Sequence, residues 1–379
     1  MKRNNYEKYI NYRTPLKNTY DKLTKDKKIN IVYFGGSITH GHGSTDADTK
    51  SWRALSAKWF KDNYPDAEIN DVNAAIGESG TYLGVYRMER DVFSQSPDLV
   101  FVEFAINDFF HGSSRQSANI QYETIVREIK VNFPACDIVT LITDCRDTAK
   151  DAYLYPQALG HEEISVIYDI PTIFVGRALV ESIDVTSDEE WNKYFIDNAH
   201  PTDLGYEKYY MCVEEFLHNS LKCSGLEVLP KPGYKEMFKV CSKQLLDGDR
   251  KYIMCDEEVA KNSKGFIYSD EVFKPLPQTP YKGYVYAKDN DAEFLYEFNG
   301  TEFGMYSNFR KNTKIEYSLD GNEYVTLDCA MHNPTLVVSD LEPGEHTIKI
   351  KPVFDEKSPD TMKIVAIFTR DNSRSSRRL

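Results

Sequence analysis

Between residues 30 and 220, short apolar runs alternate with segments whose apolar positions recur at helical spacing. Continuous apolar runs are typical of strands that are buried on both faces, and they occur at residues 30–34, 69–75, 99–104, 138–142 and 172–175. Helical spacing marks residues 51–63, 117–132 and 203–221, the last following a Pro-Thr-Asp start signal. This alternation predicts an α/β domain whose five-stranded parallel sheet is covered by helices on both sides.

The pattern changes near residue 225. The segment LEVLPKPGY contains two prolines and a glycine, which is typical of a linker. Helical periodicity then largely disappears, and short β-rich segments follow at residues 283–287, 293–298, 314–319, 324–327, 335–338, 346–353 and 362–369. Turn signals separate these segments, and LDGN is a strong hairpin signal. We therefore expect domains at 1–224 and 225–370, the second a smaller antiparallel β-sandwich, and a disordered basic tail at 371–379.

Composition narrows the choice of partners. The 379 residues carry a formal net charge of -13, which predicts that neither nucleic acid nor anionic membranes are partners. No apolar stretch approaches the length of a membrane-spanning helix, and the N-terminus has no signal-peptide core. Seven scattered cysteines without a CxxC pair predict free thiols in a reducing cytoplasm. The sequence leaves homo-oligomerisation open.

Ser37 is the first residue with candidate chemistry. It lies in YFGGSIT, directly after the first apolar run. Open parallel sheets bind their ligands at the carboxyl ends of the strands, and Gly35 and Gly36 allow a sharp turn and a close approach of substrate. The spacing differs from the G-x-S-x-G elbow of α/β-hydrolases, which excludes that fold. A serine at such a place also commonly caps a helix.

An acid and a histidine follow late in the same domain. Asp197 and His200 lie in DNAHPTDLGY, just before the last predicted helix. Asp197 can accept a hydrogen bond from one ring nitrogen of His200, while the other nitrogen takes a proton from Ser37. The order Ser, Asp, His along the chain, with each residue at a strand–helix or loop–helix junction, favours this hypothesis over a plain helix start.

Two further blocks contain candidate oxyanion donors. Asn107 lies in FAIND, just past the third apolar run, where its carboxamide can donate to a developing negative charge. An Asx turn is the structural alternative for Asn-Asp at this position. In NAAIGESG, after the second run, Gly77 and Gly80 would leave backbone N–H groups open toward the same place.

These four blocks resemble, in order, the motifs of the SGNH (GDSL-like) hydrolase family: FGGSIT, NAAIGESG, FAIND and DNAHPTDLGY. The resemblance spans most of residues 30–210 and implies a flavodoxin-like three-layer α/β/α domain. It also implies a hydrolase with Ser37, Asp197 and His200 as its triad. The implied oxyanion donors are the Ser37 N–H, the Asn107 side chain and an N–H of the glycine block. Neither a metal nor a cofactor is implied.

One position departs from the family pattern. Ungapped comparison places the family's oxyanion glycine at Glu78. A backbone N–H of Glu78 can still donate, provided that the carboxylate points away from the developing oxyanion. Gly80 is the competing candidate, and both remain open.

His40 and His42 lie in THGHGST, soon after Ser37. An H-x-H pair can bind metal, but no further ligand of suitable spacing follows, and we predict no metal site. A loop that lines the substrate, with His40 in contact with it, and a plain solvated loop are the remaining interpretations.

Aromatic and basic residues supply weaker candidates. Trp191 and Tyr194 precede the Asp197 block, and they are predicted either to bind substrate by packing on sugar rings or to be buried in the core. Arg87 and Arg90 follow the glycine block at helical spacing, and we expect them at the surface or in ion pairs.

An SGNH domain joined to a β-sandwich is similar to bacterial carbohydrate O-acetylesterases. This resemblance implies a serine esterase that removes O-acetyl groups from mannan- or xylan-derived oligosaccharides, with manno-oligosaccharides as the first choice and a possible sugar-binding role for the second domain. Two alternatives stay open: a lipid or thioester acylhydrolase of the same superfamily, and a non-catalytic carbohydrate-binding protein.

Overall fold

The computed structural model describes residues 6–151, 153–222, 248–273, 281–307, 313–329, 334–354 and 362–371. The chain divides into two compact units, Met1–Leu246 and Asp247–Leu379. The predicted linker, the predicted boundary between residues 224 and 225, and residues 372–379 of the predicted tail lie outside the described residues.

A six-stranded sheet forms the centre of the first unit. Its strand order is β1 (Ile10–Asn11), β6 (Thr172–Ile173), β5 (Asp137–Leu141), β4 (Leu99–Glu103), β2 (Lys28–Gly35), β3 (Glu68–Asn73). Strands β2 to β6 run parallel, and these are the five predicted strands. The two-residue β1 pairs antiparallel with β6 at one edge. It was not predicted, because so short a strand leaves no periodic pattern.

Helices connect the strands, and the three long helices that the pattern predicts are confirmed within two residues as α4, α7 and α12. The α-helices in the described part of this unit are α1 (Lys17–Asp21), α2 (Ser37–His40), α3 (Ala47–Lys50), α4 (Trp52–Asn63), α5 (Thr81–Asp91), α6 (Ala105–Phe110), α7 (Arg115–Asn132), α8 (Arg146–Ala149), α9 (Pro156–Ile167), α10 (Val175–Val180), α11 (Asp188–Tyr194) and α12 (Asp203–Ser220).

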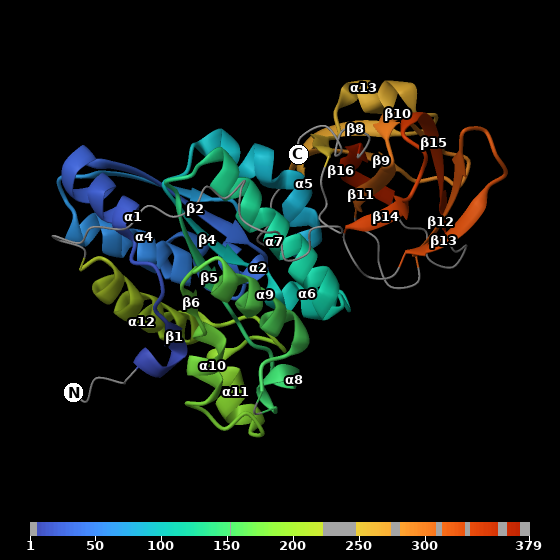
Figure 1. Ribbon diagram of the computed structural model, residues 1–379. Helices are drawn as coiled ribbons and strands as arrows, with labels where there is room; N and C mark the ends of the chain where they lie inside the picture. The colour runs from blue at the N-terminus through green and yellow to red at the C-terminus, as the bar shows by residue number, and fades with distance from the viewer. Residues whose placement is uncertain are drawn as a thin grey trace. The chain divides into compact units, whose positions relative to one another are not determined.

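The sheet is buried on both faces, as the continuous apolar runs predict. On β2, Ile31 and Tyr33 join the core under α4, α10 and α12, whereas Val32 and Phe34 join a second core under α5, α7 and α9. Figure 1 shows these two helix layers on either side of the sheet. The three-layer α/β/α architecture is therefore confirmed, and the carboxyl ends of β2 and β4 lie side by side at one edge of the layers.

The second unit is built from two antiparallel sheets, which confirms the predicted β-sandwich. One sheet has the order β10 (Phe294–Gly300), β15 (Gly344–Val353), β12 (Thr313–Leu319), β13 (Val325–Cys329). The other has the order β14 (Thr335–Val338), β11 (Glu302–Ser307), β16 (Met362–Asp371), β9 (Tyr281–Ala287), β8 (Ile267–Phe273), and β7 (Asp249–Met254) also pairs with β16. Apolar side chains of both sheets share one core.

The predicted hairpin of this unit forms between β12 and β13, where Asp320 and Gly321 have positive φ angles of 53° and 77°. Strands β7, β8 and β11 and the short helix α13 (Glu257–Asn262) were not predicted. Charged residues interrupt β7 and β8, and every residue of β11 is buried, so that none of the three alternates between apolar and polar positions.

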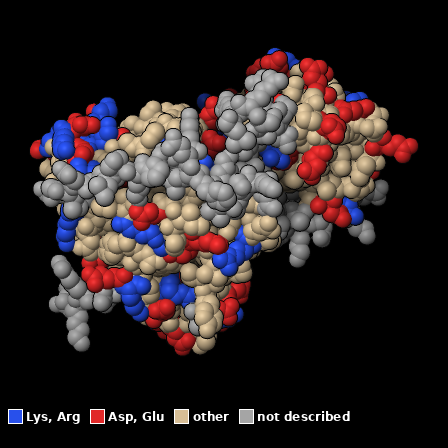
Figure 2. Space-filling model, in the orientation of Figure 1, with Lys and Arg blue, Asp and Glu red and all other residues tan. Residues whose placement is uncertain are grey.

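Five described cysteines are buried and unpaired: Cys136, Cys145, Cys212, Cys255 and Cys329. Cys223 and Cys241 lie outside the described residues. In the described part of the chain, no helix is long and apolar enough to cross a bilayer. Figure 2 shows acidic and basic side chains interspersed over the described part of one face, without a continuous basic surface.

Candidate active site

Ser37 is the first residue of α2, and Gly36 separates it from Gly35, the last residue of β2. A side chain at Gly35 would meet the Cβ of Thr39 at 2.7 Å and the carbonyl oxygen of Glu103 at 2.8 Å, so only glycine fits where the chain turns. The Ser37 side chain is buried, with 5% of the residue exposed. As the first residue of the helix, Ser37 has a backbone N–H that no helix carbonyl can accept.

Asp197 and His200 lie in the loop between α11 and α12, and they complete a hydrogen-bonded chain with Ser37. The Ser37 Oγ lies 2.7 Å from His200 Nε2. His200 Nδ1 lies 2.7 Å from Asp197 Oδ2. The other carboxylate oxygen of Asp197 accepts backbone N–H groups of Ala199 and His200, each at 2.8 Å. The carboxylate is therefore fixed in the orientation that keeps a proton on Nδ1 and leaves Nε2 facing the serine.

The electrostatics of Asp197 suit this orientation. Partial burial alone would raise the pKa of Asp197. The hydrogen bond from His200, the charge of His200 and the two backbone N–H groups outweigh it and hold the pKa well below its usual value. Asp197 is thus ionised whenever His200 acts as a base.

Side-chain contacts bring the serine loop and the histidine loop together across a long stretch of sequence. The Tyr206 hydroxyl, on α12, donates to the carbonyl oxygens of Ile38 at 3.1 Å and His42 at 2.7 Å. Asp203, at the start of the same helix, accepts the N–H of Thr45 at 2.8 Å and its hydroxyl at 2.6 Å. These contacts anchor the segment after Ser37 to the helix that follows His200.

Asn107 lies on α6, directly after β4, and is 6% exposed. Within the described chain its carboxamide makes no hydrogen bond. A Cβ added to Gly36 would stand 2.7 Å from Asn107 Nδ2, so the amide lies against the residue that precedes Ser37. The predicted donor is therefore brought beside the predicted nucleophile by the parallel pairing of β2 and β4.

The glycine block forms the loop between β3 and α5. Glu78 has a φ of 59°, in the left-handed region that favours glycine. Gly80 is the N-cap of α5 with extended backbone. Asp108, from α6, accepts the Thr81 N–H at 2.8 Å and so joins this loop to the residue next to Asn107. The family pattern has a glycine at the position of Glu78, and the left-handed backbone there is a conformation that glycine adopts readily.

The sequence of the first unit matches a known family of proteins. Residues 33–208 match the profile of the GDSL-like lipase/acylhydrolase family. Over these residues the first unit is similar to the GDSL-like lipase/acylhydrolase family. This match supports a carboxylic ester hydrolase. No curated protein sequence matches the chain.

Solved structures share the fold of the GDSL-like unit and of the second unit. A two-domain esterase (CEX) active on acetylated mannans is 20% identical, with a TM-score of 0.72 over 97% of this chain and 98% of that chain. Its structure co-crystallised with mannopentaose gives a TM-score of 0.73 with the same identity and coverage. Axe2, an acetylxylan esterase from Geobacillus stearothermophilus, is 19% identical, with a TM-score of 0.43 over 54% of this chain and 97% of its own. The first two comparisons show a common two-unit fold.

Arg87 has a role in the GDSL-like unit that its sequence did not reveal. Predicted to be a surface or ion-paired residue, it is fully buried on α5 and paired with Asp91 at 2.7 Å. Its guanidinium also donates to the carbonyls of Ala74 at 2.6 Å and Gly35 at 2.9 Å, and to the Ser79 hydroxyl at 3.0 Å. One side chain therefore ties the end of β2 to the loop that contains Glu78 and Gly80. In the sequence, only the i, i+4 spacing between Arg87 and Asp91 indicated that Arg87 forms an ion pair.

Glu103 is a second buried group that the sequence analysis missed. It ends β4 and is 1% exposed, and its carboxyl accepts the hydroxyls of Thr39 at 2.9 Å and Thr143 at 3.1 Å. Burial raises the pKa of Glu103 to about 7, against the lowering effect of these hydrogen bonds. The sequence did contain one indication of this buried carboxyl, because Glu103 interrupts the apolar run LVFVEF.

The three weaker predictions lie around the same loops. Trp191 is 2% exposed and stacks on Phe195 at 4.0 Å, and its indole N–H donates to the Asp197 carbonyl at 2.7 Å. It therefore supports Asp197 from inside and leaves no ring face for a sugar. Tyr194 is half-buried and packs against the same core. Burial and the charge of Arg53 lower the pKa of His40 to about 4, so His40 is neutral at neutral pH.

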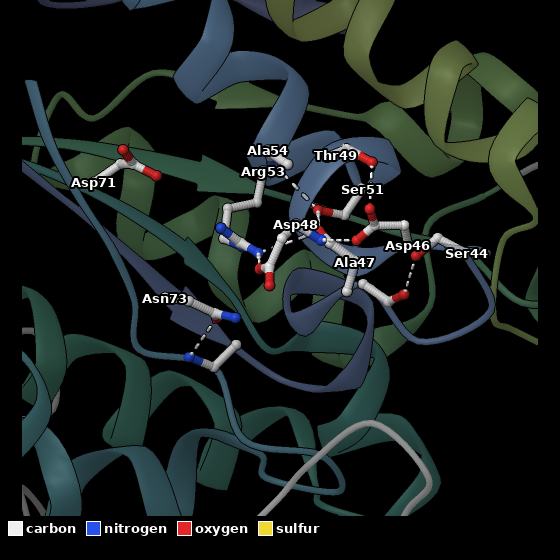
Figure 3. Close-up of polar contacts among 12 residues, drawn as sticks. Ser44, Asp46, Ala47, Asp48, Thr49, Ser51, Arg53, Ala54, Asp71 and Asn73 are labelled. Carbon is white, nitrogen blue, oxygen red and sulfur yellow. Dashed lines mark hydrogen bonds and ion pairs between the residues drawn. The ribbon is translucent and has the colours of Figure 1, made fainter.

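The segment after His42 makes polar contacts of its own, although most of residues 45–50 are exposed to solvent. Asp46 caps α3 by accepting the Asp48 N–H at 3.0 Å, and Ser51 caps α4 by accepting the Ala54 N–H at 3.2 Å. Arg53, at the start of α4, donates to Asp48 at 2.9 Å. Figure 3 shows this network, with the Arg53 guanidinium directed toward Asp48.

Proposed function

We propose that this GDSL-like protein is a serine esterase that removes O-acetyl groups from mannan-derived oligosaccharides. Ser37 is the nucleophile, His200 the general base and Asp197 the residue that orients and stabilises the imidazolium. The observation that carries the proposal is the pair of 2.7 Å contacts that joins the three side chains in this order.

In the acylation step, the Ser37 Oγ attacks the acetyl carbonyl carbon and its proton passes to His200 Nε2. The negative charge that develops on the carbonyl oxygen is stabilised by the Ser37 N–H, the Asn107 carboxamide and an N–H of Glu78 or Gly80. His200 then returns the proton to the departing sugar oxygen, which leaves as a hydroxyl, and Ser37 is acetylated.

In the deacylation step, water takes the place of the sugar. His200 removes a proton from the water as it attacks the acetyl-Ser37 carbonyl, and acetate leaves as the proton returns to the Ser37 Oγ. Asp197 stabilises the imidazolium in both steps, because its lowered pKa keeps it ionised.

The choice of an acetylated mannan fragment rests on architecture. The protein shares its two-unit fold, over 97% of its length, with an esterase described as active on acetylated mannans. Acetylated xylo-oligosaccharides are the second member of the same substrate class.

The test is to follow acetyl loss from acetylated manno- and xylo-oligosaccharides by mass spectrometry and NMR. We expect acetate release from the manno-oligosaccharides by the wild type, none by Ser37→Ala, and full release by Ser94→Ala, which removes an exposed serine outside the site. Activity that survives in Ser37→Ala would overturn the assignment of the nucleophile.

The same preparation separates the two alternatives. A lipid or thioester acylhydrolase would hydrolyse p-nitrophenyl esters faster as the acyl chain lengthens, whereas the proposal expects acetate to be preferred. A non-catalytic carbohydrate-binding protein would bind the oligosaccharides without hydrolysing p-nitrophenyl acetate.

A further inference from the structure

His42 lies beside the proposed triad but has no part in the proposed reaction. Its ring meets that of His200 edge-on, with the ring centroids 4.3 Å apart. The His42 N–H donates to the Ser37 carbonyl at 2.9 Å, and the His42 carbonyl accepts the Tyr206 hydroxyl at 2.7 Å. Because the backbone is held on both sides, the imidazole is kept next to His200.

This placement completes a set of metal-ligand atoms. One donor atom from each of His42, Asp197 and His200 lies within 4.8 Å of the other two, and no other such group of histidine, cysteine and acidic residues occurs in the described chain. Two imidazoles and a carboxylate form a ligand set that zinc takes in proteins, with the fourth position left to water. Ligands of a tetrahedral zinc lie roughly 3.4 Å apart, so rotations that move the donors by about 1 Å close the set.

The set is open to ions from solvent. The side chains of Asp197 and His200 are 46% and 20% exposed, and His42 is half-buried. The Asp197 carboxylate is the acidic member of the set. A chain with a net charge of -13 further favours the approach of a cation.

We propose that His42, Asp197 and His200 form a site at which zinc binds and reversibly inhibits the enzyme. Ions that prefer imidazole ligands, such as zinc, nickel and copper, fit this set. Magnesium and calcium, which prefer oxygen ligands, do not. Sequence spacing concealed the site, because the ligands that follow the H-x-H pair come from a loop more than 150 residues later.

Inhibition follows from the bonding of His200, and this step rests on the proposed function. A neutral imidazole has one nitrogen with a lone pair and one that carries hydrogen. Nε2 faces Ser37 and Nδ1 faces Asp197. Whichever nitrogen zinc takes, the remaining one carries the hydrogen and cannot accept the Ser37 proton. Zinc binding and general-base catalysis by His200 therefore exclude one another.

The test measures p-nitrophenyl acetate hydrolysis by the full chain during titration with zinc chloride, with magnesium chloride in parallel and EDTA added at the end. We expect inhibition by zinc alone, with recovery after EDTA. His42→Phe keeps a ring against His200 but removes the ligand. It should weaken zinc inhibition by at least about tenfold, because even groups that only support a metal ligand contribute 10–100-fold to affinity.

The matched control is His218→Phe, which removes an exposed imidazole outside the site and should leave zinc inhibition as in the wild type. If His42→Phe fails to fold, His42→Gln keeps a polar side chain with a weaker ligand and gives the same comparison. Equal inhibition of the His42 variants and the wild type overturns the proposal.

Zinc binding is also measured directly on Ser37→Ala, by competition with a chromogenic chelator. This variant keeps all three ligands, and we expect one zinc per chain, lost when His42→Phe is added. An inactive wild type with His42-dependent zinc binding would reject the esterase function but not the zinc site. An active wild type that neither binds zinc nor is inhibited by it would reject the zinc site alone.

Discussion

The two sides of the active site are built differently. Ser37 and Asn107 follow directly from adjacent parallel strands and are 5% and 6% exposed. Asp197 and His200 lie in a loop between two helices, with side chains 46% and 20% exposed. The nucleophile side is therefore positioned by the sheet and by buried groups behind it. The base side is positioned by hydrogen bonds within its own loop and remains accessible to solvent, which is also why a metal ion can reach it.

The first prediction tests whether the exposed base side is as essential as the buried side. His200→Ala should lower kcat for p-nitrophenyl acetate by about 10⁴-fold or more, since it removes the imidazole that lies 2.7 Å from the Ser37 Oγ. Asp197→Asn should cost less, because its main effect is on the tautomer and charge of His200. Steady-state kinetics check this, with His218→Ala as control. A His200→Ala enzyme of near-normal turnover would mean that a different base operates.

The second prediction concerns the buried side alone. Asn107→Ala should lower kcat by about 10²–10³-fold with little change in KM, because the amide donates to the charge of the transition state. Gly36→Ala should act in the same direction, since its Cβ would lie 2.7 Å from Asn107 Nδ2 and displace the amide. Asn70→Ala, at an exposed site, is the control. If Asn107→Ala raised KM instead of lowering kcat, the amide would be a ground-state contact.

The third prediction distinguishes the two sides by pH. Glu103, behind Ser37, has a pKa raised from 4.5 to about 7, so the folded state holds its proton more tightly than the unfolded chain does. Below pH 4.5 the Glu103 carboxyl is neutral in both the folded and the unfolded state. As the pH rises from 4.5 to 7, the unfolded chain loses this proton before the folded state does, so the free energy of unfolding falls by about 3 kcal/mol. Glu103→Gln should flatten this fall, as measured by urea unfolding at pH 5 and pH 7.5.

Asp197 gives the opposite sign on the base side. Its folded pKa lies below the unfolded value, so its contribution is present above pH 3.8 and is lost as the pH falls further. Asp197→Asn should therefore diminish the loss of stability below pH 3.8. An unaltered slope in Glu103→Gln would show that another group causes the fall.

The fourth prediction tests the support of the oxyanion loop. Arg87→Lys should lower kcat by about 10–100-fold at nearly constant KM, because a single ammonium cannot hold Gly35, Ala74 and Ser79 together, and small displacements of catalytic donors cost this much. Arg90→Lys, on the same helix, is the matched control. A variant that lost stability but kept its kcat would show that Arg87 acts only in the core.

The smallest effect is expected at Glu78. Glu78→Gly removes the strain of a left-handed backbone at φ 59°, which should stabilise the folded state by about 1 kcal/mol. The greater conformational freedom of glycine in the unfolded chain largely offsets this stabilisation. Turnover should stay within a few-fold of wild type, whereas Gly80→Ala should lower it, because the added Cβ would clash with Asp108 Oδ1. Kinetics and urea unfolding of both variants check this. A large loss of turnover in Glu78→Gly would mean that its carboxylate, and not only its backbone, has a role.

The sequence by itself determined the five parallel strands, the long helices, the β-sandwich and the places of Ser37 and Asn107. Burial on both faces of a strand and on one face of a helix leaves a local pattern, and parallel pairing brings adjacent strand ends together. The order of four sequence motifs also indicated the resemblance to the GDSL-like family.

Only the tertiary structure decided what surrounds those residues. The contacts of Arg87 with Gly35 and the approach of His42 to His200 depend on packing between segments far apart in the chain. No local pattern encodes such contacts, because each depends on where two separately specified segments meet. The left-handed backbone at Glu78 is of the same kind, since the structure around it imposes a conformation that a glutamate does not favour by itself.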